Sequence, residues 1–191
     1  MKIIGKNSLL YWLRIPFAIY VVGFILSSLW IFGLMFYHAF TQNYNSFITN
    51  RSIEHFKYDD DDKVEKTLNL IEFKYPFTKM CVATENTAEG IVMAFLGLLS
   101  FSFILFFALK IVLKLSNDQI FSAKIVRDFK FLGYGLICFG IIHIIVDLVT
   151  SVNRFDISSP FFYILTGLVL IFLKEIFYKA QKIQEENDLT I

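Results

Sequence analysis

The sequence predicts an all-α membrane protein, a bundle of four transmembrane helices with a small extracytoplasmic loop domain in which β-structure is expected. Three observations predict this class. The chain has 191 residues, of which 56% are hydrophobic and 18% aromatic. Its apolar residues gather in four runs with few or no charges, and the loops between the runs differ greatly in length. A soluble domain of this size would be less apolar and would not concentrate the excess in blocks.

The first apolar run extends from Ile15 to Phe40, 26 residues without Asp, Glu, Lys or Arg. This length exceeds the roughly 20 residues that a helix needs to cross about 30 Å of hydrocarbon.

The basic residues Lys2, Lys6 and Arg14 precede the run, as basic residues precede the apolar region of a signal peptide. The apolar region of a signal peptide has only about 7 to 15 residues, and no small-x-small cleavage site follows here. We therefore interpret the run as a retained span.

Three further runs predict three further spans, each ending near a charged or polar residue. Glycines punctuate all four runs, and small residues allow helices to approach closely in lipid. The expected organisation is an N-terminal segment at 1–14, spans at 15–40, 91–109, 131–150 and 157–173, an outer loop domain at 41–90, an inner loop at 110–130, a short outer loop at 151–156 and a helical tail at 174–191.

Lysine and arginine are distributed unequally between the two sides. The N-terminal segment, the 110–130 loop and the tail together hold 11, whereas the 41–90 and 151–156 loops hold seven over a longer stretch of chain. Short cytoplasmic segments carry an excess of these residues. We expect both termini and the 110–130 loop to be cytoplasmic.

Several function classes have little support. The net charge is only +1, which argues against direct nucleic-acid binding because such proteins carry a basic stripe. Cys81 and Cys138 are too few for a disulfide framework or a cysteine-based zinc site. G-x-S-x-G, H-E-x-x-H and phosphate-binding glycine loops do not occur. We expect a non-enzymatic protein without a cofactor or a bound metal.

The sequence of the outer loop domain predicts a β-hairpin. The segment "TLNLIEFKYPFT" (67–78) alternates apolar and polar residues, with Ile71 out of phase, which indicates a strand with a bulge. "NSFITNRSIEHF" (45–56) supplies an antiparallel partner, and "DDDDK" (59–63) lies at the turn, interpreted as a solvated acidic turn rather than a calcium loop. Two strands alone are marginally stable, so we expect them to pack on the bundle or on a second copy in a homo-oligomer.

Polar residues also occur within the predicted spans. "IIHIIVDLVTS" (141–151) places His143 and Asp147 on one helical face, since they are four residues apart. His38 and Arg154 are expected at the same outer level, so the four residues could form a ligand or polar cluster. A structural His–Asp contact compensated by Arg154 is favoured over a site for a small molecule or a proton, and a metal site is the least favoured. Ionisable groups in a span usually face the bundle interior or water.

The cytoplasmic segments show two features of a binding surface. Ser116 and Gln119 match a capping box, and Phe121 is an apolar residue within a polar loop. The tail continues the fourth span as a helix with an apolar stripe that includes Ile176 and Ile183. This helix either lies along the membrane surface or the 110–130 loop, or binds a soluble partner.

The segments "LSNDQIFSAKIVRDFKFLGYGLI" and "EIFYKAQKIQEENDLTI" resemble a bacterial four-helix membrane family called domain of unknown function 2975. The matching positions are Leu115, Ser116, Phe121, Leu132, Gly133, Glu175, Ile176, Phe177, Glu186, Asp188, Leu189, Thr190 and Ile191. The sequence departs from the family pattern at Val126 or Arg127, where Asn is common, and at Ala180, where Gly is common. The resemblance implies a multi-pass protein of the bacterial inner membrane. It also implies a cytoplasmic helix-turn-helix partner, since members are often encoded beside such a regulator.

Together these features favour a sensory or regulatory membrane protein that binds a cytoplasmic DNA-binding regulator through the 110–130 loop and the tail. The residues expected to contribute are Ser116, Phe121, Phe177, Ile183, Glu186, Asp188 and Leu189. The alternative is a small carrier or pore subunit that uses the polar cluster at the outer leaflet.

Overall fold

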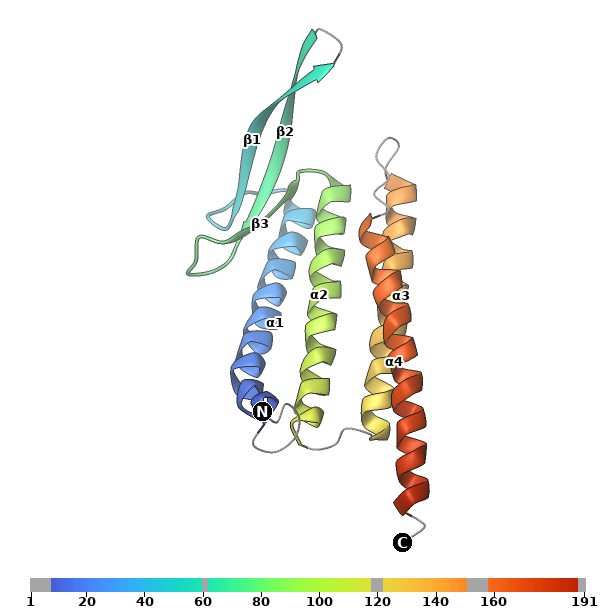
Figure 1. The fold of residues 1–191 in the computed structure, drawn as a ribbon. Helices are drawn as coiled ribbons and strands as arrows, with labels where there is room; N and C mark the ends of the chain where they lie inside the picture. The colour runs from blue at the N-terminus through green and yellow to red at the C-terminus, as the bar shows by residue number, and fades with distance from the viewer. Residues whose placement is uncertain (1–7, 60–61, 118–121, 151–157, 189–191) are drawn as a thin grey trace. The chain divides into compact units, whose positions relative to one another are not determined.

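A computed structural model gives the fold of residues 8–59, 62–117, 122–150 and 158–188, with side chains described except at 53–68, 150, 187 and 188. It contains four long helices and a three-stranded sheet (Figure 1). In chain order the elements are α1 (Leu9–Thr41), β1 (Ile48–Asp59), β2 (Asp62–Lys74), β3 (Cys81–Glu85), α2 (Ala88–Leu115), α3 (Ala123–Thr150) and α4 (Ser158–Asp188).

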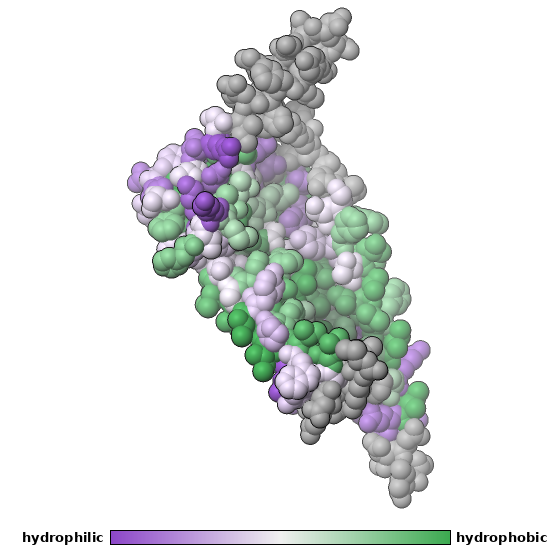
Figure 2. All heavy atoms as spheres, turned by 60° about the vertical axis from the view of Figure 1, so that its left-hand side comes forward, coloured by the Kyte–Doolittle hydropathy of each residue, from purple (hydrophilic) through white to green (hydrophobic). Residues whose placement is uncertain are grey.

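All four helices are long and apolar enough to cross a membrane, which confirms the predicted class. Their surfaces carry many exposed large apolar side chains, and Figure 2 shows hydrophobic residues covering much of the visible helical surface. Pro16 lies inside α1 and removes one backbone donor there. Such prolines are tolerated in membrane helices, where neighbouring groups satisfy the freed carbonyl. The expected span limits inside these helices stay predictions.

The tail is helical as far as Asp188, where the described part of the chain ends, as the sequence indicates. α4 has 31 residues, which correspond to about 46 Å at a rise of 1.5 Å per residue. This length exceeds the hydrocarbon thickness of about 30 Å. About 16 Å of α4 therefore remains for a part that projects beyond the hydrocarbon.

The chain divides into two compact units. The first comprises residues 1–24 and 99–191, and the second comprises residues 25–98. The first unit holds the start of α1, most of α2, and all of α3 and α4. The second holds the remainder of α1, the sheet and the start of α2.

The first unit has an apolar core where α2, α3 and α4 meet. Its buried members are Phe107, Ile111, Ile125, Phe129, Leu132 and Leu136. Aromatic rings contribute to this core: Phe103 of α2 lies 5.5 Å from Phe139 of α3 between ring centroids, and 4.8 Å from Phe107 within α2. Aromatic pairs at these separations contribute beyond the area they bury.

Glycines set the close approach of α3 and α4. A Cβ atom at Gly133 would lie 2.9 Å from the carbonyl oxygen of Gly167, and one at Gly167 would lie 2.7 Å from the carbonyl oxygen of Gly133. About two turns further along α3, a Cβ at Gly140 would lie 3.0 Å from the carbonyl oxygen of Pro160 in α4. The two backbones pack against each other at a distance that larger side chains would prevent.

The second unit contains the predicted hairpin and a strand that the sequence did not indicate. β1 and β2 pair antiparallel in continuous register from Ile48↔Phe73 to Asp59↔Asp62, and β3 adds to the other edge of β2. The expected bulge at Ile71 was wrong. Ile71 and Phe73 are both fully buried two residues apart, so regular alternation holds and it is Leu70 that faces away.

The sheet packs on helices, as expected for so small a sheet. Ile48, Ile71 and Phe73 form one buried core with Ile31 and Met35 of α1, and α2 adds partly buried residues that include Ile91 and Phe95. Tyr75 borders this core. Burial raises the pKa of its phenol because the charged form would lose hydration.

The glycine contact leads to a stability prediction. Gly167→Val should destabilise the protein by about 1–3 kcal/mol, the usual cost of forcing extra carbon atoms into a packed contact. The matched control is Gly23→Val, because a Cβ at Gly23 meets nothing within 4 Å. Denaturation in detergent micelles, followed by circular dichroism, measures both variants. Equal losses at the two positions would contradict the proposed role of the contact.

Candidate functional site

Four polar residues from three helices gather inside the first unit and form what we call the polar cluster: Ser100 of α2, His143 and Asp147 of α3, and Tyr163 of α4. Ser100, His143 and Asp147 are 0%, 6% and 4% exposed, and Tyr163 is half-buried. All four lie within helices long and apolar enough to span a membrane. Burying such polar groups within a membrane span costs free energy, so they usually pair with one another or have a functional role.

The cluster is joined by two contacts between helices. The imidazole of His143 stacks on the phenol ring of Tyr163 at 5.3 Å between centroids and 24° between planes. The hydroxyl of Tyr163 and that of Ser100 form a hydrogen bond of 2.7 Å, in which either can donate. The close α3–α4 approach at Gly140 brings these rings into contact, since Pro160 precedes Tyr163 by less than one turn.

His143 retains hydrogen-bonding capacity. Its Nε2 atom is buried and has no hydrogen-bond partner among the residues that the structure describes. Asp147 lies one turn further along the same face of α3 and is also buried. A neutral imidazole has one donor and one acceptor nitrogen, so this ring can bind a polar group or exchange a proton.

The geometry does not resemble a nucleophilic triad. The Ser100 hydroxyl is paired with Tyr163, and His143 contacts Tyr163 through its ring face rather than accepting a proton from Ser100. A catalytic base must lie within hydrogen-bond reach of its nucleophile. Within the described ranges, no three His, Cys, Asp or Glu residues are grouped as metal ligands.

The structure brings together only part of the four-residue cluster predicted from sequence. His143 and Asp147 share one buried face of α3. His38 belongs to the second unit, and Arg154 falls outside the described residues. The convergence of all four residues therefore stays a prediction.

His38 lines a recess of its own in the second unit. This recess has a volume of about 570 Å³ and lies where α1 ends and α2 begins. His38, Gln42, Tyr44, Asn86 and Thr87 provide its polar lining. The amide of Asn86 donates a 2.9 Å hydrogen bond to the Tyr44 hydroxyl, and His38 Nδ1 lies 3.4 Å from the Asn43 carbonyl oxygen.

A second charged site lies at the other end of α3, where the 110–130 loop is. Asp128 is 1% exposed and forms an ion pair with Lys114, while Lys110 Nζ lies 3.8 Å from its second oxygen. Lys114 also donates a 3.2 Å hydrogen bond to the carbonyl oxygen of Lys124. The two ends of the loop are therefore tied together by Asp128. Removing one partner of such a buried ion pair destabilises a protein by about 3–5 kcal/mol, because the other charge is left buried without compensation.

The residues predicted to bind a partner differ in their positions. Phe177 stacks on Phe129 of α3 at 5.1 Å between centroids, whereas Ile183 is 59% exposed. Ser116 is buried, and its hydroxyl donates a 2.8 Å hydrogen bond to the Leu113 carbonyl oxygen at the end of α2. Glu186 is exposed. Phe121, Leu189 and the side chain of Asp188 lie outside the described residues, as does Gln119 of the expected capping box.

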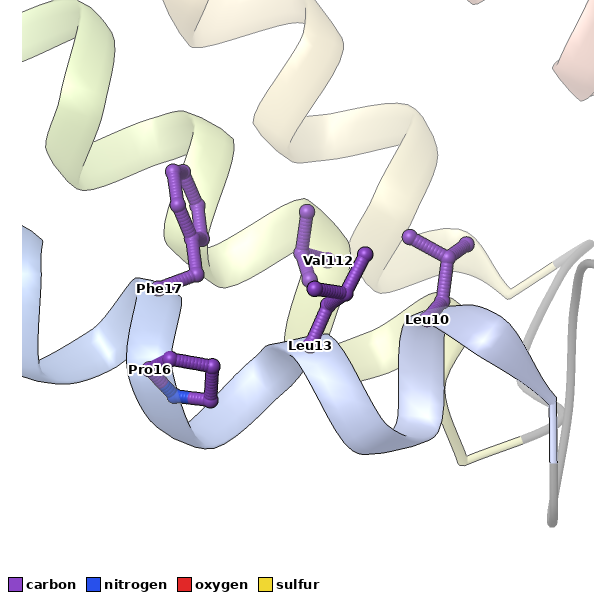
Figure 3. A pocket seen from close by; sticks show the side chains of 5 residues that line it. All are labelled: Leu10, Leu13, Pro16, Phe17 and Val112. Atoms are coloured by element: carbon purple, nitrogen blue, oxygen red, sulfur yellow. The ribbon is translucent and has the colours of Figure 1, made fainter.

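The start of α1 joins the same end of the first unit. Arg14 donates a 3.3 Å hydrogen bond from Nη1 to the Asn117 side-chain oxygen and lies 3.9 Å from the centre of the Tyr11 ring. Beside it, apolar side chains of α1 and Val112 of α2 enclose a recess of about 340 Å³ (Figure 3). Its lining is wholly apolar, which is typical of a surface that lipid tails fill.

Sequence reasoning missed Ser100, Tyr163 and Asp128. Ser100 and Tyr163 are lone polar residues in apolar runs, and nothing in their spacing indicates that they meet. Asp128 carried a signal, because it is the acid of "KIVRDFK" in a basic segment that leads straight into a span. Ionisable residues at a span's edge that have opposite charges nearby are candidates for buried pairs.

The fold and these sites define a class: a multi-pass membrane protein with four spanning helices, a buried polar cluster and a small sheet domain. A family model described as a protein of unknown function (DUF2975) matches residues 11–191. The chain belongs to this family, which confirms the resemblance seen in its second half. Searches of curated proteins and of solved structures found no match.

The Ser100–Tyr163 hydrogen bond can be tested with a double-mutant cycle. Ser100→Ala, Tyr163→Phe and the double variant should give a coupling energy of about 0.6 kcal/mol and at most about 1.7 kcal/mol, the average and the maximum for hydrogen bonds between membrane helices. Tyr163→Phe retains the aromatic ring that stacks on His143, so the cycle isolates the hydroxyl pair. Unfolding in mixed detergent micelles gives the four free energies. Strictly additive losses would show that the two hydroxyls are not coupled.

Proposed function

We propose that this protein is a non-enzymatic sensory or regulatory subunit of the bacterial inner membrane that binds a cytoplasmic helix-turn-helix regulator. The 110–130 loop and the projecting end of α4 would form the binding surface, with both termini in the cytoplasm. The lysine and arginine distribution supports this orientation.

The observation that carries the proposal is the contact between the tail and the base of the loop. Phe177 of α4 stacks on Phe129 of α3, and Asp128 beside it holds Lys114 of α2. The projecting helix and the segment that enters α3 are therefore parts of one packed surface. A surface built on rigid elements presents its side chains in a fixed arrangement, which favours specific recognition.

The exposed side of the tail has the composition of a helical binding face. Ile176 and Ile183 are 62% and 59% exposed and lie seven residues apart, so they occupy the same side of α4. Exposed basic residues at 124, 127 and 130 adjoin the loop. We infer a partner surface that combines an apolar groove with acidic side chains, since helix recognition commonly uses apolar anchors spaced in this way.

A pair of charge-introducing variants tests this surface. Ile183→Glu should weaken binding of the regulator by roughly tenfold or more, because apolar anchors at an interface contribute about 1–2 kcal/mol or more each. Tyr178→Glu is the matched control: it introduces the same charge at an exposed apolar residue of the same helix, about 140° around the axis from Ile183. Equilibrium binding to the nanodisc-embedded protein gives the affinities.

The partner itself is identified first by photo-cross-linking. A photoreactive amino acid at position 183 should capture a helix-turn-helix protein in intact cells, and one at Phe172, which is exposed within the apolar part of α4, should not. Recovery of the same proteins from both positions, or equal affinities for the two glutamate variants, would contradict the proposal.

A second candidate function is a small carrier or pore subunit. It is favoured by buried His143, which lies beside Asp147 and whose Nε2 has no hydrogen-bond partner in the described part of the chain. Under this hypothesis, His143→Phe or Asp147→Asn abolishes flux through liposomes that contain the protein, because the side chain that binds the proton or solute is lost. His143→Phe preserves an aromatic ring on Tyr163 and should leave folding intact. A pH-sensitive dye inside the liposomes measures proton flux. Absence of flux in the unaltered protein would exclude a proton pathway.

A further inference from the structure

The loop between β2 and β3, residues 75–80, has two large apolar side chains on the surface of the protein. Phe77 is fully exposed and Met80 is 69% exposed. The loop is nevertheless ordered by its own hydrogen bonds, since the amide of Tyr75 donates to the Met80 carbonyl oxygen at 3.1 Å and the amide of Met80 donates to the Thr78 hydroxyl at 3.2 Å. These two side chains are held outward by a structured turn.

The backbone of Phe77 adds to this observation. Its φ angle is +61°, in the left-handed region that favours glycine. A bulky residue is an outlier in this conformation. Strained positions of this kind concentrate at binding sites and switch regions, where the strain is compensated by other interactions. The Phe77 ring is fully exposed, so contacts of this ring with the described residues do not offset the cost.

The loop begins beside Trp30, in the second half of the apolar helix α1. Lys74, the residue before the loop, accepts a 3.3 Å hydrogen bond on its carbonyl oxygen from Nε1 of Trp30 in α1. The Trp30 ring also contacts Phe47 edge-on at 5.4 Å between centroids. Trp30 therefore marks the level along α1 at which the loop begins.

The same residue marks the expected edge of the hydrocarbon. If the hydrocarbon begins just after Arg14, about 20 residues of helix carry its far edge to about Leu34. Trp30 lies within one or two turns of that level, and tryptophan is enriched at the interface between lipid and water. Strand edges and loops do not lie exposed within hydrocarbon, so the sheet must remain on the water side of this boundary.

Lysines flank the apolar tip. Lys74 and Lys79 bracket Phe77, and Lys79 is exposed. Apolar and aromatic side chains next to basic ones are typical of segments that lie in a membrane interface, where the apolar groups reach the acyl chains and the basic groups meet lipid phosphates. The loop combines this composition with a position at the interface.

We propose that the β2–β3 loop is a membrane anchor for the sheet, with Phe77 and Met80 inserted at the acyl boundary and Lys79 at the lipid phosphates. The partner is a lipid surface that contains anionic phospholipid. The anchor would hold the sheet on the bilayer in addition to its packing on α1. This assignment does not depend on the proposed regulatory role.

Site-specific fluorescence tests the anchor in the full chain. Cys81 and Cys138 are exposed and are first replaced by serine. Phe77→Cys, labelled with the environment-sensitive dye NBD, is then placed in nanodiscs of phosphatidylcholine and phosphatidylglycerol. We expect a blue-shifted emission, several-fold stronger quenching by lipid that carries a nitroxide near the head group, and weaker quenching by aqueous iodide than at the control position. The control is Asn69→Cys, an exposed position in β2 outside the loop.

Met80→Cys, labelled in the same way, keeps the test decisive if the variant at Phe77 does not fold. Lys79→Glu should reduce the lipid-dependent quenching in nanodiscs that contain phosphatidylglycerol but not in those of phosphatidylcholine alone. A label as accessible to iodide as the one at Asn69 would overturn the proposal. A label shielded from both iodide and the lipid quencher would also overturn it, because a protein surface would then cover the loop.

Discussion

The first unit depends on the backbone contact between α3 and α4. In lipid, apolar burial no longer drives helices together, so close approach has to come from small residues that permit dense packing. Gly133 and Gly167 provide it reciprocally, and Gly140 extends it toward Pro160. This close approach allows side-chain contacts between α3 and α4 on both sides of the glycines. Toward one end, Tyr163 reaches His143, and toward the other, Phe177 reaches Phe129.

α3 carries buried charge-bearing groups near both of its ends. Asp128 lies near its start and pairs with Lys114 of α2, while Asp147 lies near its end beside His143. The two acids are 19 residues apart in the sequence, or about 29 Å along a continuous helix. The buried ion pair fixes the helix against α2, whereas His143 keeps a ring nitrogen without a partner among the described residues. The first arrangement is suited to holding structure, and the second retains capacity to bind.

The second unit shows how a small sheet is kept on a membrane protein. The sheet buries one apolar face on the C-terminal half of α1 and the start of α2, through Ile48, Ile71 and Phe73. The edges of an open sheet have unpaired backbone groups and need water. This requirement places the sheet beyond the hydrocarbon, although α1 stays apolar and uncharged as far as Phe40. The uncharged length of α1 therefore includes residues that pack against protein rather than lipid.

The sequence by itself determined the four spanning helices, the helical tail and the β1–β2 hairpin, because run length, charge and alternation are local properties of the chain. It also indicated that His143 and Asp147 share a face, which follows from helical spacing alone. Only the tertiary structure decided that Ser100 and Tyr163 complete their cluster, that β3 extends the sheet, and that Asp128 pairs with Lys114. The bulge expected at Ile71 failed for a related reason. Which of two adjacent apolar residues, Leu70 or Ile71, faces inward depends on the surface that the strand packs against, and that surface comes from a distant part of the chain.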